Sequence, residues 1–154
     1  MKRVIAVIGG RRVKKGLLLM AEDVGRLIAE RGAVLLCGGL GGIMEASAKG
    51  AKDAGGLTLG VLPQDDKGHA NPFIDIPVAT GLGIGRNVII ARTADAFVAI
   101  GGQYGTLSEI AFSLQLKKPV IGIETWDIDG VIRAETPEDA VRKIFDNLKY
   151  KSVL

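Results

Sequence analysis

The sequence predicts an α/β fold built on a mostly parallel β-sheet with helices on both faces. Short aliphatic runs alternate with amphipathic stretches along the whole chain, as expected when each strand is followed by a crossover helix. Glycine makes up 22 of the 154 residues, about twice its average usage, and it gathers where the aliphatic runs end. The layout is therefore Rossmann-like and doubly wound, and we expect residues 1–154 to form a single domain.

The elements of the first half follow from the spacing of apolar residues. Continuous aliphatic runs predict buried strands, whereas apolar residues three and four apart predict helices. The expected order is strand 4–8, helix 17–31, strand 33–37, helix 43–54, strand 57–62 and a short strand 73–78. Because Pro77 cannot donate to a sheet, we place the last of these strands at an edge.

The second half continues the same alternation around a central strand. The expected order is a glycine-rich turn 80–86, helix 87–94, strand 95–100, a helix reaching about residue 117, strand 119–124, a loop 125–134, a helix to about residue 148 and a tail 150–154. We expect strand 119–124 to be the last strand of the sheet. Thr136 and Pro137 predict the start of the final helix, since they supply an N-cap and a proline at the first helical position.

Composition excludes several classes of partner. The net charge is +3 and acidic residues are interspersed with basic ones, so we expect no nucleic acid partner. The basic residues of segment 11–15 are expected to meet a small anion or solvent. Cys37 is the only cysteine, which favours a reducing compartment. We find neither a signal peptide nor a run long enough to cross a membrane, so we expect a cytoplasmic protein with no membrane partner.

The polar segment 64–72 is expected to be a solvated loop. It contains Asp65, Asp66 and His69, the only histidine. A single histidine without a fixed partner spacing is poor support for a metal site. We therefore predict no metal, and the sequence leaves the role of this loop open.

The stretch 101–109 predicts an anion site, because a strand becomes a helix there. The glycines at 101, 102 and 105 let a ligand approach main-chain N–H groups closely. Thr106 is the expected N-cap, with Glu109 three residues on as its capping-box partner. The N–H groups and dipole of a helix that begins there favour a phosphate. Glu109 has two open interpretations, a capping partner alone or a residue with a further role in the site.

A second glycine-rich turn is expected to face the same pocket, since strand-to-helix turns of a parallel sheet share one edge. Its glycines are Gly38, Gly39, Gly41 and Gly42. Close packing of helix on strand is the alternative reason for these glycines. Arg86 follows flexible backbone at a helix start, where it can pair with a phosphate or carboxylate. The first strand is not followed by G-x-G-x-x-G, so we do not predict NAD.

The run Gly101-Gly102-Gln103-Tyr104-Gly105-Thr106-Leu107-Ser108-Glu109 resembles the P-G-G-x-G-T-x-x-E motif of the LONELY GUY family, long mislabelled as lysine decarboxylases. The run 91–97 and the turn 38–42 match this family too, and the similarity covers nearly the whole chain. Members are phosphoribohydrolases that cleave the N-glycosidic bond of cytokinin or adenine 5′-monophosphates. The resemblance implies catalytic roles for Arg86 and Glu109. Lysine decarboxylation is not expected, because no lysine lies in a recognisable pyridoxal-phosphate site.

Two departures from that motif point to a sister branch. Within the motif, Gly101 replaces the proline and Gln103 replaces the second glycine; upstream, Gly85-Arg86-Asn87 stands where the family's signature reads H-E-R-K. This form resembles the branch of molybdenum-cofactor carrier proteins, which hold a phosphorylated pterin in a Rossmann-like fold. That resemblance implies a homodimer or homotetramer, no required cofactor, and the molybdenum cofactor (molybdopterin) as a possible carried ligand.

Three functions remain open on the sequence. The first is a protein that binds a phosphorylated nucleotide- or pterin-like molecule. The second is a nucleoside 5′-monophosphate phosphoribohydrolase, in which Glu109 stabilises a cationic ribosyl centre, and the third is a scaffold with a vestigial pocket. The expected ligand-binding residues are Gly38, Gly39, Gly41, Gly42, Arg86, Asn87, Gly101, Gly102, Gln103, Tyr104, Gly105 and Thr106.

Overall fold

One parallel sheet organises the computed structural model, which describes residues 1–151 and side chains through residue 150. Seven strands form the sheet within these residues, in the order β4-β3-β2-β1-β5-β6-β7. The strands are β1 Val4–Gly9, β2 Val34–Cys37, β3 Thr58–Leu62, β4 Ile76–Ala79, β5 Ala96–Ile100, β6 Val120–Ile123 and β7 Val131–Arg133. The predicted α/β class with a parallel sheet is confirmed.

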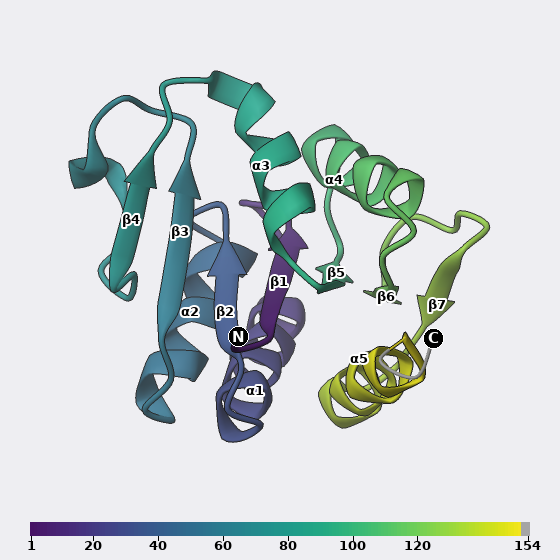
Figure 1. Ribbon diagram of the computed structural model, residues 1–154. Helices are drawn as coiled ribbons and strands as arrows, with labels where there is room; N and C mark the ends of the chain where they lie inside the picture. Colours follow the sequence, from purple (N-terminus) through teal and green to yellow (C-terminus); the bar gives the residue numbers. More distant parts are fainter. Residues whose placement is uncertain (152–154) are drawn as a thin grey trace.

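Helices cover both faces of the sheet, as predicted (Figure 1). Helices α1 (Lys15–Glu30), α2 (Ile43–Asp53) and α5 (Pro137–Lys151) pack on one face, and α3 (Arg86–Thr93) and α4 (Tyr104–Gln115) on the other. Two short 3₁₀ turns, Lys67–His69 and Gly83–Gly85, precede β4 and α3. The two buried layers between sheet and helices are mainly aliphatic, as the composition requires.

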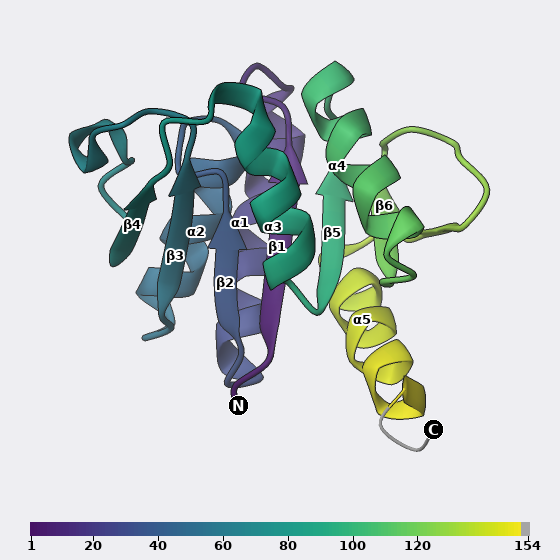
Figure 2. The ribbon, with the colours of Figure 1, turned by 45° about the horizontal axis from the view of Figure 1, so that its top comes forward.

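The strand order reverses direction beside β1, and this sets the position of the site. From β1 the chain moves outward through β2 and β3 to β4, then returns to β5 on the other side of β1. The pair β1–β5 is in register from Ile5–Ala96 to Gly9–Ile100. In open parallel sheets, ligands bind outside the carboxyl ends of the strands at such a switch point. Figure 2 shows the strand arrows of β1, β2 and β5 pointing to one edge of the sheet.

The structure corrects three predicted elements. The expected loop 125–134 contains a seventh strand, β7, which pairs with β6. Three residues are too short to show a strand pattern, and Gly130, at φ +96°, turns the chain into them. The expected tail is helical at Tyr150 and Lys151, the last turn of α5, and residues 152–154 lie outside the described part. The strand expected over 73–78 is shifted to Ile76–Ala79, although its edge position is confirmed.

Membrane insertion was not expected from the hydropathy of the chain. Among the described residues, none of the helices combines the length and the apolar composition that crossing a bilayer requires.

Candidate functional site

A cavity of about 1490 Å³ lies at the carboxyl ends of β1, β2 and β5. Its wall brings together residues that the sequence places in separate segments. Ten of the predicted site residues line it: Gly38, Gly41, Arg86, Asn87, Gly101, Gly102, Gln103, Gly105, Thr106 and Glu109. The two glycine-rich turns therefore share one edge of the sheet, as predicted.

Helix α4 begins earlier than the sequence predicts. Its N-cap is Gln103 and its first residue is Tyr104, so the predicted N-cap Thr106 and capping box with Glu109 are wrong. The chain turns at Gly101 and Gly102, which have φ angles of +56° and +98°, and helical geometry is possible directly after them. Thr106 is buried against the Cα of Gly102. Any side chain on residue 102 would collide with Thr106.

The first turn of α4 is open to a ligand. Among the described residues no side chain caps it, so its first N–H groups lack the partners that a capping residue supplies. The turn itself is held from behind by the segment after β6. Thr125 Oγ1 donates to the carbonyl of Gly101 at 2.6 Å, and Trp126 Nε1 donates to the carbonyl of Gln103 at 3.1 Å. The arrangement suits an anion that approaches the helix start from the cavity.

Arg86 is anchored within the protein as well as facing the cavity. Its Nε donates to the carbonyl of Val61 at 2.9 Å, and its Nη2 donates to the carbonyl of Gly38 at 3.4 Å. Its Nη1 donates to the side-chain oxygen of Asn87. A Cβ on Gly38 would lie 2.5 Å from Arg86 Nη2, so glycine is needed there to make room for the guanidinium. Through these three hydrogen bonds, the Arg86 side chain connects α3 to β3 and to the turn after β2.

Asn87 joins the starts of α3 and α4. Its Nδ2 donates to Ser108 Oγ at 3.1 Å, and Ser108 Oγ donates to the carbonyl of Gly105 at 2.7 Å. Because Asn87 also accepts from Arg86, one chain of hydrogen bonds connects the β2 and β3 ends to the first turn of α4. This network holds the cavity wall in one arrangement.

Glu109 is the buried carboxyl group of the cavity. It is 7% exposed and its pKa is raised from 4.5 to about 7, because burial penalises the charged form more than the nearby Arg86 charge favours it. Burial likewise lowers the pKa of Arg86, which the Glu109 charge partly offsets. No ion pair connects the two side chains within the described residues. A carboxyl group poised near neutral pH can hold or give up a proton at the cavity.

Three of the predicted ligand-binding residues lie outside the cavity wall, namely Gly39, Gly42 and Tyr104. Gly39 packs against the side chain of Leu62. Tyr104 is 80% exposed, and its ring centroid lies 6.1 Å from that of Trp126. Gly42 packs against the backbone of Arg11 in the loop after β1. Close packing therefore accounts for both glycines, although the contacts are not the helix-on-strand packing weighed as the alternative.

The sequence prediction omitted one wall of the cavity. Gly9 at the end of β1 and the connection 10–14 to α1 line it, and the connection includes three basic side chains. The sequence assigned these basic residues to a small anion or solvent without linking them to the glycine-rich turns. Glu124 also lines the cavity, and its φ of +45° is unusual for a residue other than glycine. Nothing in the sequence marked Glu124.

The loop with Asp65, Asp66 and His69 lies apart from this cavity wall. Asp66 Oδ1 accepts from the amide of Gly68 at 2.6 Å and caps the short 3₁₀ turn there. His69 Nδ1 lies 3.3 Å from the carbonyl oxygen of Asp66. Within residues 1–151, no group of three or more histidine, cysteine or acidic side chains is arranged to hold a metal ion.

The model of the SLOG cluster4 family matches residues 2–152. An uncharacterised protein of Archaeoglobus fulgidus is 49% identical over 144 residues, which are 89% of this chain and 91% of that protein. A cytokinin riboside 5′-monophosphate phosphoribohydrolase of Mycobacterium tuberculosis is 32% identical over 75% of this chain and 67% of that protein.

Two solved structures resemble the whole described fold. The molybdenum cofactor binding protein of Rippkaea orientalis superposes with a TM-score of 0.91 and 36% identity, over 96% of this chain and 98% of that chain. The molybdenum cofactor carrier protein of Chlamydomonas reinhardtii superposes with a TM-score of 0.88 and 35% identity, over 96% and 99%. These likenesses connect the chain to both branches that its motif resembles.

Proposed function

Because the chain belongs to the SLOG cluster4 family, we propose that it binds and carries a small phosphorylated molecule of nucleotide or pterin type. The observation that carries this proposal is the uncapped start of α4, which faces a cavity between glycine-rich turns. Such a helix start favours a phosphate group. The likeness to a molybdenum cofactor carrier supports a phosphorylated pterin as the cargo.

In this proposal the phosphate lies at the glycines of turn 101–105. The volume of about 1490 Å³ exceeds the range of about 300–1,000 Å³ of ordinary small-molecule sites, so a nucleotide or a pterin has room. Arg86 contributes positive charge and holds the turns in place, and the protein requires no cofactor of its own. Gly38 and Gly41 complete the opposite wall.

A second candidate function is hydrolysis of the N-glycosidic bond of a nucleoside 5′-monophosphate. The position of Glu109 favours it, since a buried carboxyl group with a pKa of about 7 can stabilise a developing ribosyl cation or transfer a proton. The relative from Mycobacterium tuberculosis carries the name of this activity. Lysine decarboxylation is not part of either proposal.

Incubation with AMP separates the two candidates. Native mass spectrometry over an hour reports the protein–AMP complex and free adenine in one sample. A stoichiometric complex without adenine release supports the carrier. Release of adenine together with ribose 5-phosphate, lost in Glu109→Gln, would overturn it in favour of the hydrolase. Binding of neither AMP nor a pterin phosphate at millimolar concentration would refute both and favour the scaffold.

We also propose that the protein is a homodimer or homotetramer of single-domain subunits in the cytoplasm. Large apolar side chains exposed just before α3 and on α4 support the assembly; they are Leu82, Ile84, Tyr104 and Phe112. These two helices contact each other through Asn87 and Ser108, so the side chains belong to neighbouring elements. Light scattering during size-exclusion chromatography tests the assembly, and an Ile84→Glu variant that leaves the mass unchanged would count against this surface.

A further inference from the structure

The connection between β1 and α1 places three cations at the cavity. Arg11, Arg12 and Lys14 all line it, and all three side chains are exposed. Across the side chains that the structure describes, none of them forms an ion pair with a carboxylate. We call these three residues the basic arm. Three unpaired cations on one side of a cavity present a surface for a negatively charged group.

The charges of the cavity wall do not balance. The basic arm and Arg86 contribute four positive charges, against the two carboxyl groups of Glu109 and Glu124. An excess of two positive charges remains when both carboxyl groups are ionised, and it grows to three when Glu109 is protonated. Arg11 lies close enough to Arg86 for its charge to lower the pKa of Arg86. A bound anion with two negative charges would relieve this repulsion.

Packing holds the basic arm beside the start of α4. The carbonyl of Gly10 accepts from the amide of Ile43 at 3.1 Å, which fixes the loop to the start of α2. A Cβ on Gly42 would lie 2.5 Å from the Cα of Arg11, and a Cβ on Gly10 would lie 3.5 Å from the Cα of Gly102. The arm therefore lies between turn 38–42 and turn 101–105. The second of these turns directly precedes the open N–H groups of α4.

We infer that Arg11, Arg12 and Lys14 bind the phosphate that lies at the first turn of α4, and that they favour phosphomonoesters over singly charged phosphodiesters. This inference rests on the proposed function and adds the residues that neutralise the ligand. Arg86 has a different task, because three of its donors are directed to protein acceptors. Gly42 positions the arm, since only glycine leaves room for the backbone of Arg11.

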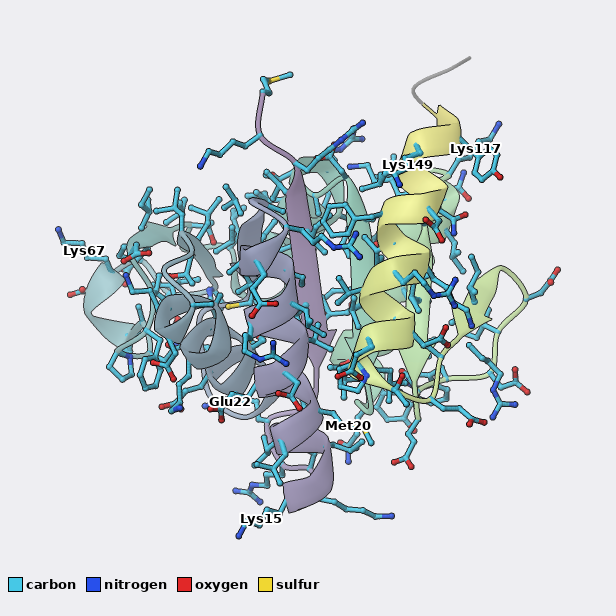
Figure 3. All side chains as sticks on the ribbon, turned by 90° about the horizontal axis from the view of Figure 1, so that it is seen from below. Lys15, Met20, Glu22, Lys67, Lys117 and Lys149 are labelled. Carbon is cyan, nitrogen blue, oxygen red and sulfur yellow. The ribbon has the colours of Figure 1, made fainter. Side chains whose placement is uncertain are left out.

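Calorimetric titration with ribose 5-phosphate tests the arm, because this probe has no N-glycosidic bond to be cleaved. Each of the variants Arg11→Gln, Arg12→Gln and Lys14→Gln should bind about tenfold more weakly, as loss of one charge-assisted hydrogen bond predicts. The triple variant should lose most of the dependence of affinity on salt. Lys15→Gln is the matched control, since Lys15 extends into solvent at the start of α1, outside the cavity wall (Figure 3); it should bind like the wild type.

The outcomes separate this inference from the proposed function. If the wild type binds ribose 5-phosphate and the triple variant binds it equally well, the inference is wrong and the carrier proposal survives. If the wild type does not bind ribose 5-phosphate, the inference is wrong; if it binds neither AMP nor a pterin phosphate as well, the proposed function is also wrong. Equal affinity of the wild type for AMP and 3′,5′-cyclic AMP would overturn the preference for phosphomonoesters.

A glycine pair tests the positioning role separately. Gly42 and Gly32 both have positive φ angles, +69° and +73°, but a Cβ on Gly32 would meet nothing within 4 Å among the described residues. Gly42→Ala and Gly32→Ala both place an alanine at positive φ, but only Gly42→Ala also brings a Cβ against the backbone of the arm. We expect Gly42→Ala alone to weaken ribose 5-phosphate binding, by about tenfold or more if contact with one arm cation is lost. Equal affinities of the two variants would remove Gly42 from the inference.

Discussion

The burial of Glu109 predicts that the protein becomes less stable as the pH rises through neutrality. The folded protein holds the Glu109 proton with a pKa of about 7, against an ordinary value of 4.5. The stabilisation from this proton is therefore complete below about pH 4.5 and is lost as the pH rises through about 7. A shift of this size corresponds to roughly 3 kcal/mol in total, of which about 2 kcal/mol should be lost between about pH 5.5 and about pH 8.5.

Glu109→Gln should remove this pH dependence, because glutamine keeps the shape of the protonated acid without a titrating group. Urea unfolding of both proteins at several pH values measures it, and a difference of about 2 kcal/mol moves the midpoint by roughly 1 M. Glu135→Gln at an exposed position is the control and should leave the wild-type profile intact. The reasoning fails if the wild type and Glu109→Gln lose stability in parallel over this range.

Two further predictions concern buried or clustered acceptors. Arg86→Gln should lower the free energy of unfolding by roughly 2–4 kcal/mol in urea titrations, since the carbonyls of Val61 and Gly38 lose a charged donor; an unchanged midpoint would contradict the anchoring role. Lys118→Met should cost about 1–2 kcal/mol, because Lys118 Nζ donates to the carbonyls of Ala91, Arg92 and Ala94 at the end of α3. Amide hydrogen exchange in the last turn of α3 should become faster in that variant. Protection that stays the same as in the wild type would argue against Lys118 as a cap of α3.

The fold was readable from the sequence because the buried strands are mainly apolar runs and most connections carry a glycine or a proline signal. The errors arose where that signal is absent. Strand β7 has only three residues, and its pairing with β6 depends on tertiary position and not on a local pattern. The start of α4 was misplaced because Thr106 fits a capping pattern, whereas the turn at Gly102 places the N-cap three residues earlier, at Gln103.

The site was predictable in part, for a related reason. The glycine-rich turns and Arg86 are local motifs, and parallel topology places strand ends together. The basic arm was visible as a charge cluster, but its place beside Gly102 depends on how the loop after β1 packs against α2. Glu124 carries no motif, since its position at the cavity follows from the left-handed backbone at the end of β6. The raised pKa of Glu109 likewise depends on burial, which a helix pattern does not reveal.

The charge of Glu109 also predicts how a carrier of this kind binds and releases its ligand. The second pKa of a phosphomonoester is about 6, so the phosphate gains its second negative charge as the pH rises toward 7. Binding of ribose 5-phosphate to the basic arm should strengthen over this range. Above about pH 7, Glu109 becomes an anion in the same cavity and should repel the phosphate. Affinity measured by calorimetry should therefore pass through a maximum near neutral pH in the wild type. Glu109→Gln should keep the rise and lose the fall, and a fall that persists in this variant would show that another group opposes binding at high pH.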